Sequence, residues 1–255
     1  MNKPRILITN DDGIYSKGIY ALWQAMNELG HTFVVAPNSE QSAKSHSITI
    51  SNPIRVQEIE RENGFKGYAV CGTPADCAKI AIRSLMIDQP DILISGINQG
   101  ANLGTNLIYS GTVSAAAEGA ILGISSIAIS LASFKSDDYG TAKKVATDVV
   151  KHVMKTNLPR GTLLNVNVPA CNEKMINGYR ITRQGNQNFL DEFEERFNPK
   201  QETYYWIKGK VIDEDRSIDF DGKALSENYV SITPVHYRLT NESYLEELKQ
   251  QFLDE

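Results

Sequence analysis

The sequence lacks the features that mark membrane-spanning, secreted and nucleic-acid-binding proteins. No apolar stretch in its 255 residues approaches the ~20 residues that a membrane span needs. The residues after Met1 do not form the charged and apolar segments of a secretory signal. Lysine and arginine total 26 against 31 acidic residues, and the formal net charge of −5 gives no basic excess for duplex nucleic acid. We therefore expect neither a membrane nor a duplex nucleic-acid partner.

Neither the cysteines nor the histidines show the spacing of a metal site. The three cysteines, Cys71, Cys77 and Cys171, are odd in number and form no Cys-x-x-Cys pair, which argues against a disulfide framework and a thiolate zinc site. The four histidines are scattered, without H-x-H or H-E-x-x-H spacing. This cysteine usage is typical of a reducing compartment, so the cytoplasm is the expected location.

Strand and helix patterns alternate through the first two thirds of the chain. Short apolar runs predict strands, and amphipathic or Ala-rich stretches between them predict helices. The predicted strands are residues 6–9, 33–37, 68–71, 91–95, 126–131 and 162–168, and the predicted helices are residues 19–29, 113–122, 141–155 and one that begins after Thr73. Such alternation predicts a Rossmann-like α/β fold with a doubly wound, mainly parallel sheet.

The pattern changes after about residue 170. Residues 179–183, 203–212 and 229–233 look like strands without intervening helices, and residues 202–213 with Gly209 predict an extended β-hairpin arm. Thr240-Asn241 is expected to cap a last helix at residues 244–252. We predict an α/β catalytic core at residues 1–170 and a helix-poor extension at residues 171–255. A tail of this kind often supplies an oligomer contact.

Asn10-Asp11-Asp12-Gly13 directly follows the first predicted strand. Ligands bind beyond the carboxyl ends of such strands. Two adjacent carboxylates are costly to hold together unless water, a lysine or a divalent cation lies between them, and the divalent cation is the most informative of these alternatives. Asp and Gly are also ordinary turn residues, so this motif alone is more typical of a turn without a ligand.

Two further loops carry polar groups at predicted strand ends. Residues 95–104 are rich in Gly and Asn, and Asn98 offers a neutral oxygen that suits a hard cation, although a surface loop would look the same. Ser110-Gly111-Thr112 opens the Ala-rich helix, where free N–H groups and the helix dipole favour a phosphate. An ordinary N-cap remains the alternative there. Oxygen ligands of these kinds favour Mg²⁺ or Mn²⁺.

Several familiar motifs are missing from the sequence. There is no G-x-x-x-x-G-K-[ST], no G-x-G-x-x-G after the first strand and no G-x-S-x-G around Ser110. The first strand also does not end in D-x-D-x-T. An ordinary P-loop NTPase, a dinucleotide-binding enzyme, an α/β-hydrolase and a haloacid-dehalogenase-type phosphatase are therefore disfavoured.

Taken together, five ordered blocks resemble the SurE family (survival protein E) of metal-dependent nucleoside-monophosphate phosphatases. The blocks are ILITNDDG at residues 6–13, VVAPNSEQSAKSHSIT at residues 34–49, GTPADC at residues 72–77, SGINQGANLGTNLIYSGTVSAAAEG at residues 95–119 and SITPVHYRLT at residues 231–240. The resemblance covers nearly the whole chain and is patchier at residues 170–228.

The resemblance implies a site for one divalent metal ion per subunit. By motif, its ligands are Asp11, Asp12, Ser42 and Asn98. Asn98, Ser110, Gly111 and Thr112 are then expected to bind the substrate phosphate. Two departures concern loop flexibility rather than ligand chemistry: Ser16-Lys17-Gly18 replaces the usual Ala-Pro-Gly, and Ala43 replaces a glycine.

We therefore expect a phosphomonoesterase that converts nucleoside 5′- and 3′-monophosphates to nucleoside and phosphate. Asp11 and Asp12 are the expected catalytic residues, since one of them can orient or deprotonate the attacking water. The resemblance also implies a homodimer or homotetramer. A nucleotide-binding module without turnover is the alternative; an acyl or glycosyl hydrolase is disfavoured because adjacent carboxylates cannot easily flank one bond.

Overall fold

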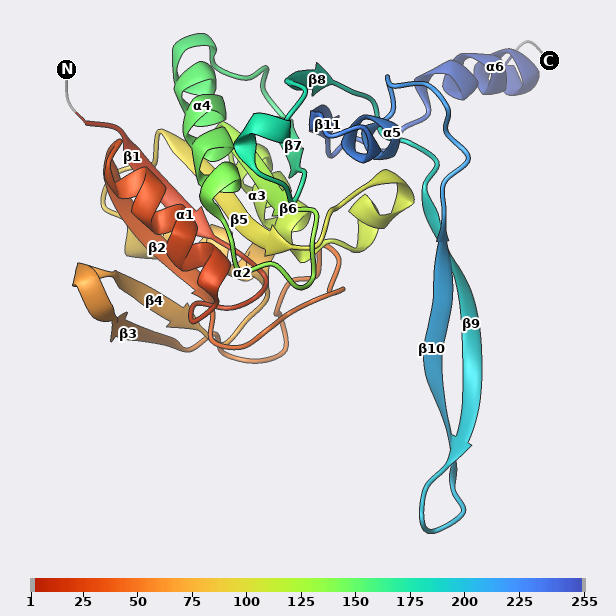
Figure 1. Cartoon of the computed structure of the whole chain (residues 1–255), viewed down its shortest axis with the longest axis horizontal. Coiled ribbons are helices and arrows are strands. Elements are labelled where there is room, and N and C mark those ends of the chain that lie inside the picture. Colours follow the sequence, from red (N-terminus) through yellow and green to blue (C-terminus); the bar gives the residue numbers. More distant parts are fainter. Residues whose placement is uncertain (1–2, 254–255) are drawn as a thin grey trace.

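A nine-stranded sheet forms the centre of the computed structural model, which describes residues 3–253 (Figure 1). The ends of the two predicted domains, residues 1–2 and 254–255, lie outside the described residues. In spatial order the strands are β3 (Val56–Glu60), β4 (Lys66–Val70), β2 (His31–Pro37), β1 (Arg5–Thr9), β5 (Ile92–Gln99), β6 (Ser126–Leu131), β7 (Thr162–Val168), β11 (Val230–His236) and β8 (Tyr179–Ile181). The six strands from β4 to β7 are parallel, while β3 and β11 run antiparallel to their neighbours β4 and β7.

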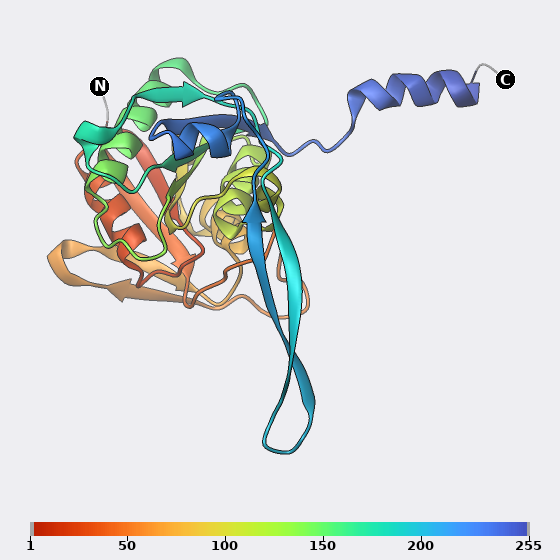
Figure 2. The same ribbon diagram turned by 45° about the vertical axis from the view of Figure 1, so that its right-hand side comes forward.

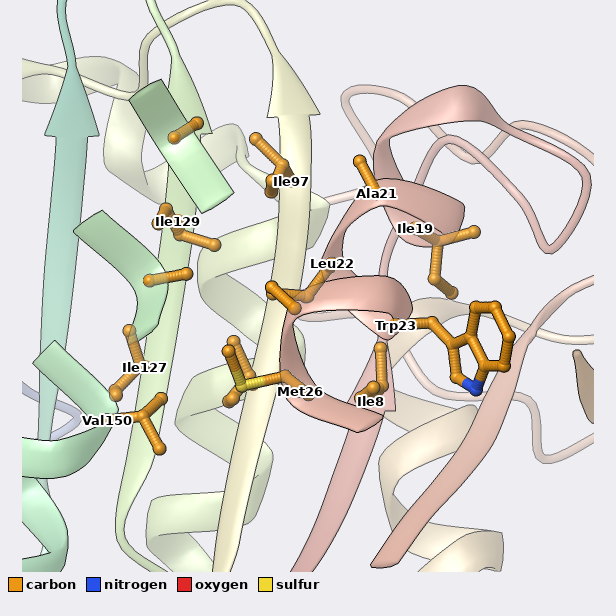
Figure 3. Packing of buried hydrophobic residues seen from close by; sticks show 14 of the residues in the cluster. Ile8, Ile19, Ala21, Leu22, Trp23, Met26, Ile97, Ile127, Ile129 and Val150 are labelled. Atoms are coloured by element: carbon orange, nitrogen blue, oxygen red, sulfur yellow. The ribbon is translucent and has the colours of Figure 1, made fainter. Parts of the chain in front are cut away.

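Helices cover both faces of this sheet. On one face, α1 (Lys17–Asn27) and α4 (Gly140–Thr156) pack over a cluster that includes Ile6 and Ile8 of β1. Figure 3 shows Leu22 and Met26 of α1 against this cluster. On the other face, α2 (Pro74–Ile80) and α3 (Gly111–Ile121) bury a second cluster that includes Leu7. The predicted doubly wound α/β fold is therefore confirmed.

The helix starts follow from their capping residues. Thr73 and Asp76 form a reciprocal capping box: the Asp76 N–H donates to Thr73 Oγ1 at 3.1 Å, and the Thr73 N–H donates to an Asp76 carboxylate oxygen at 2.9 Å. Asn241 caps α6 (Glu242–Leu253) by accepting from the Tyr244 N–H at 3.1 Å. Both helix starts agree with the sequence prediction.

The predicted hairpin arm is present and is longer than predicted. Strands β9 (Asn188–Phe197) and β10 (Thr203–Ile212) pair antiparallel along their whole length, from Asn188 opposite Ile212 to Phe197 opposite Thr203. The arm projects away from the sheet, and α6 projects separately (Figures 1 and 2). The acidic stretch at residues 191–195 is thus the middle of β9.

The chain beyond residue 170 also adds strands to the main sheet. β11 pairs with β7, and β8 pairs with β11. The short helix α5 (Asp221–Ser226) precedes β11 and was not predicted. The remaining elements are short helical turns: η1 (Glu62–Gly64), η2 (Ala81–Leu85), η3 (Gly104–Tyr109) and η4 (Glu173–Met175). The division of the chain near residue 170 stays a prediction.

No helix in the described part of the chain is both long enough and apolar enough to cross a membrane.

Candidate functional site

The acidic turn and the Gly/Asn-rich loop lie at the same edge of the sheet. β1 and β5 are neighbours, with Thr9 opposite Ser95, so the segments that follow them emerge side by side. The register of β5 against β6 shifts between Ser95 and Asn98. Gly96 makes this irregularity possible, because its φ is +143° and a Cβ there would lie 2.3 Å from the Ile129 carbonyl oxygen. The shift brings Asn98 to the edge where Asp11 and Asp12 lie.

The N-terminus of α3 packs directly against Asp11. A Cβ added to Gly111 would lie 2.7 Å from the Asp11 Cβ, so only glycine allows this approach. The next residue, Thr112, is fully buried and donates its hydroxyl to Asp11 Oδ1 at 2.6 Å. Ser110 caps the helix by accepting from the Val113 N–H at 3.1 Å.

The loop after β2 completes the site from a third direction. The Gln41 backbone N–H donates to the Asp11 carbonyl oxygen at 2.8 Å, which fixes this loop to the acidic turn. The hydroxyl of Ser42, one residue further, donates to Glu40 Oε1 at 2.6 Å. Ser42 and Glu40 both line the cavity that Asp11 and Asp12 share.

These loops surround a cavity of ≈ 650 Å³, a volume suited to a small-molecule ligand. Five residues from the sequence prediction line it: Asp11, Asp12, Ser42, Asn98 and Ser110. Gly111 and Thr112 lie behind Asp11 instead, and the Thr112 hydroxyl is engaged by that carboxylate. The Thr112 backbone N–H also hydrogen-bonds the Asp11 carboxylate.

The two aspartates are electrostatically unfavourable neighbours in this setting. Asp11 is only 5 % exposed, and burial raises its pKa, although the Thr112 hydrogen bond opposes that rise. Burial and the nearby charge of Asp11 raise the pKa of Asp12 to about 7. Neither aspartate forms an ion pair with a side chain within residues 3–253. A cation would relieve this cost.

The available donors fit a hard divalent cation. No cluster of three or more His, Cys, Asp or Glu side chains arranged to hold a metal occurs in the described residues, so neutral oxygens must complete any such site. Asn98 suits this role because its amide nitrogen donates to the Gly100 carbonyl at 2.7 Å and leaves the side-chain oxygen available. Carboxylate, amide and hydroxyl oxygens are the ligands that Mg²⁺ and Mn²⁺ accept.

Sequence reasoning missed several residues that line the cavity. Glu40 adds a third carboxylate, and Asp137 forms an ion pair with Lys17 at 2.5 Å across the cavity rim. Phe134 and Tyr139 belong to the segment after β6. Glu40 lies two residues before the predicted ligand Ser42, which is the one signal that could have found it.

The buried carboxylate of Glu118 forms a cluster with His46, in the loop after β2, and Lys79. The Glu118 side chain in α3 is 4 % exposed and pairs with His46 Nε2 at 2.9 Å and Lys79 Nζ at 3.1 Å. These contacts lower the pKa of Glu118 despite its burial. Because His46 follows Ser42 in the same loop, the cluster fixes the far end of the segment that carries Ser42.

Comparison with known proteins places this geometry in a family. The family description "Survival protein SurE" matches residues 6–191. The 5′-nucleotidase SurE of Thermosipho africanus is 45 % identical over 249 residues, covering 98 % of each chain. That of Natranaerobius thermophilus is 46 % identical and covers 93 % of this chain and 94 % of its own. The crystal structure of SurE protein from Aquifex aeolicus superposes with a TM-score of 0.85 at 38 % identity and covers 99 % of this chain and 100 % of its own. The chain described here therefore belongs to the SurE family.

Proposed function

We propose that the chain is a 5′-nucleotidase, a phosphoric monoester hydrolase that converts nucleoside 5′-monophosphates, and also 3′-monophosphates, to nucleoside and phosphate. One divalent cation per subunit, Mg²⁺ or Mn²⁺, would be held by Asp11, Asp12, Ser42 and Asn98. The observation that carries this proposal is the pair of adjacent aspartates after β1, Asp11 buried and Asp12 partly buried, which line a cavity beside a helix N-terminus and have no cationic side-chain partner within the described residues.

The chemistry divides between the cation and the protein. A cation at this position supplies charge for the phosphoryl oxygens and acidifies a water molecule. The orientation of the Asp11 carboxylate is fixed, because the Thr112 hydroxyl donates to it. Asp12 is less buried and lines the cavity, where it can orient the attacking water or accept a proton from it.

The helix N-terminus supplies the phosphate cradle. No acidic residue occupies the first turn of α3, so its free N–H groups and dipole are not neutralised from within. Ser110 lines the cavity at this end, beside Asp11. The Gly111 N–H and the Ser110 hydroxyl would bind the phosphoryl oxygens and stabilise the charge that they gain in the transition state. The Ser110 N–H already donates to the Leu107 carbonyl, and the Thr112 N–H hydrogen-bonds Asp11.

Two wider features of the proposal come from the rest of the chain. The hairpin arm carries exposed apolar side chains that would be covered in a homodimer or homotetramer. All three cysteines are free, in keeping with a reducing compartment such as the cytoplasm.

Phosphate release from nucleoside 5′- and 3′-monophosphates tests the proposal directly. The assay compares added Mg²⁺, added Mn²⁺ and excess chelator, with Asp11→Asn as the matched inactive variant. Metal-dependent release that the variant lacks supports the proposal. A folded protein that binds nucleotide but releases no phosphate with either metal would instead be a nucleotide-binding module without turnover.

A further inference from the structure

Two exposed aromatic rings, those of Phe134 and Tyr109, line the cavity, and Phe134 is the more exposed of the two. Phe134 lines the cavity and is 81 % exposed. The cavity floor nearby is formed by carboxylates, amides and hydroxyls, including Asp11, Asp12 and Asn98. Single exposed apolar side chains are common on protein surfaces, but this ring lines a ligand-sized cavity and is open to contact with a bound molecule.

The ring packs on Gly100, the residue that directly follows β5, the strand that carries Asn98. A Cβ added to Gly100 would lie 2.3 Å from the Phe134 Cε1 atom, so the ring occupies space that only a glycine leaves open. Gly100 is two residues from Asn98, and the Asn98 amide nitrogen donates to the Gly100 carbonyl. The ring therefore packs on a residue that is two positions from the proposed cation ligand Asn98.

The segment that carries the ring is held in place by hydrogen bonds. Ser133 Oγ accepts from the backbone N–H groups of Lys135 at 3.1 Å and Ser136 at 3.0 Å. The Gln99 side chain donates to the Ser136 carbonyl at 3.1 Å, which ties the segment back to β5. Little ordering would be needed when a ligand packs against the ring.

We propose that Phe134 is the platform on which the nucleobase of the substrate stacks. This inference rests on the proposed function and names the part of the substrate that the rim recognises. The phosphate lies at the aspartates and the base extends along β5 to the ring above Gly100. Stacking against an aromatic ring favours every base, because each base has a π face.

The neighbouring polar groups support tolerance toward different bases. The Gln99 amide nitrogen is bound to Ser136, and the Asn102 amide nitrogen donates to Ser130 Oγ at 2.9 Å. These donors are committed to the protein and are poorly placed to read the edge of a base. Purine monophosphates should bind better than pyrimidine monophosphates because of their larger stacking area, without strict selection of one base.

The test compares substrates with and without a base. Wild type, Phe134→Ala and Phe134→Leu are assayed for phosphate release from adenosine 5′-monophosphate and from glycerol 2-phosphate. Phe134→Ala should raise KM for the nucleotide by about 5- to 30-fold and leave KM for glycerol phosphate within about twofold. Phe134→Leu keeps apolar bulk without a π face, so its KM for the nucleotide should lie between those of wild type and Phe134→Ala. Ile87→Ala removes an exposed apolar side chain from the opposite edge of the sheet and should change neither KM.

The outcomes separate this inference from the proposed function. Equal changes in KM for both substrates, or no change for either, would overturn the stacking role of Phe134. Neither result would contradict the proposed phosphatase function. Calorimetric titration with adenosine 5′-monophosphate and with inorganic phosphate makes the same comparison without turnover. If the wild type releases no phosphate, weaker binding of the nucleotide alone to Phe134→Ala would still support the platform, and unchanged binding would overturn it.

Discussion

The hydroxyl of Thr112 donates to Asp11 Oδ1 at 2.6 Å, and this bond joins the start of α3 to the end of β1 across 101 residues of sequence. It occupies one oxygen of a nearly buried carboxylate and leaves the other free. Groups that support a metal ligand in this way orient it and commonly change metal affinity or activity by about 10- to 100-fold. Thr112 is thus a positioning residue for Asp11.

Replacing Thr112 tests this role. Thr112→Val keeps the shape of the side chain but removes the hydroxyl, so Asp11 loses its fixed orientation. We expect Mn²⁺ affinity and phosphate release to fall by about 10- to 100-fold. Thr112→Ser keeps the hydroxyl and should retain most of both. Calorimetric Mn²⁺ titration with an activity assay measures the effect; equal losses in the two variants would show that the methyl group, not the hydrogen bond, matters.

Removing the Asp11 charge should separate activity from stability. Asp11→Asn deletes a proposed cation ligand, so phosphate release should fall by at least about 100-fold, more than the loss typical of a supporting residue. The same change relieves the cost of a buried charge whose pKa burial has raised, so the metal-free variant should unfold at a higher temperature than metal-free wild type.

Asp91→Asn is the matched control for that experiment. Asp91 lies at the other end of β5, where hydrogen bonds and charge from Arg5 lower its pKa. Its neutralisation should reduce stability slightly and leave phosphate release unchanged. Wild-type activity in a folded Asp11→Asn protein would rule out Asp11 as a required group.

The stability of the metal-free protein should depend on pH in a specific direction. The pKa values of Asp11 and Asp12 are raised in the folded state, that of Asp12 to about 7, from an unfolded value of 3.8. Between about pH 4 and pH 7 the folded state therefore binds more protons than the unfolded state, and the free energy of unfolding falls as pH rises. Thermal unfolding in chelator across this range measures the slope. Asp12→Asn should flatten it, and an unchanged slope in that variant would contradict the assignment.

Glu118 should contribute to both stability and the placement of Ser42. Glu118→Gln weakens the charged contacts with His46 and Lys79 and should lower the free energy of unfolding by about 1.5–3 kcal/mol. The loop at residues 39–47 should then be cleaved more readily by protease, and Mn²⁺ should bind more weakly. Urea unfolding, limited proteolysis and metal titration check the three effects. A loss of stability with unchanged Mn²⁺ affinity would show that the cluster does not hold the Ser42 loop.

The parts of the fold that the sequence predicts are those with local signals. Buried parallel strands such as β1 give uninterrupted apolar runs, and the Thr73 capping box marks its helix within four residues. The sequence predicts that β5 ends at Ser95, where the Gly- and Asn-rich stretch begins. In the structure the strand continues through a register shift to Gln99, since Gly96 packs against β6. Strand β3 was missed because an exposed edge strand carries little apolar periodicity.

In the candidate site too, the residues that could be predicted are those with local sequence signals. Asp11, Asp12 and Asn98 follow predicted strands, so topology alone brings them to one edge. The partnership of Glu118 with His46 spans 72 residues, and the seating of Phe134 on Gly100 depends on the packing of two neighbouring strands. No local pattern encodes such contacts. Ser42 came from the resemblance to the family, because its loop contains several serines that composition does not distinguish.

The hairpin arm provides a test of assembly. A two-stranded hairpin is at best marginally stable alone in water, and this one exposes Phe193, Tyr205 and Ile207. We expect another subunit to cover these side chains. Replacing residues 189–211 by a short Gly-Ser turn is feasible because Asn188 and Ile212 are paired in register. The mass measured by light scattering should fall, while Mn²⁺ binding persists because no proposed cation ligand lies in the arm.

Point variants refine the arm experiment. Phe193→Gln removes an apolar side chain that would be covered, whereas Glu192→Gln changes the neighbouring residue, whose side chain points to the opposite face of the strand. Phe193→Gln should shift the assembly toward smaller species at low protein concentration, and Glu192→Gln should not. If the arm deletion and Phe193→Gln both keep the wild-type mass, the arm has no part in assembly and its exposed apolar side chains need another explanation.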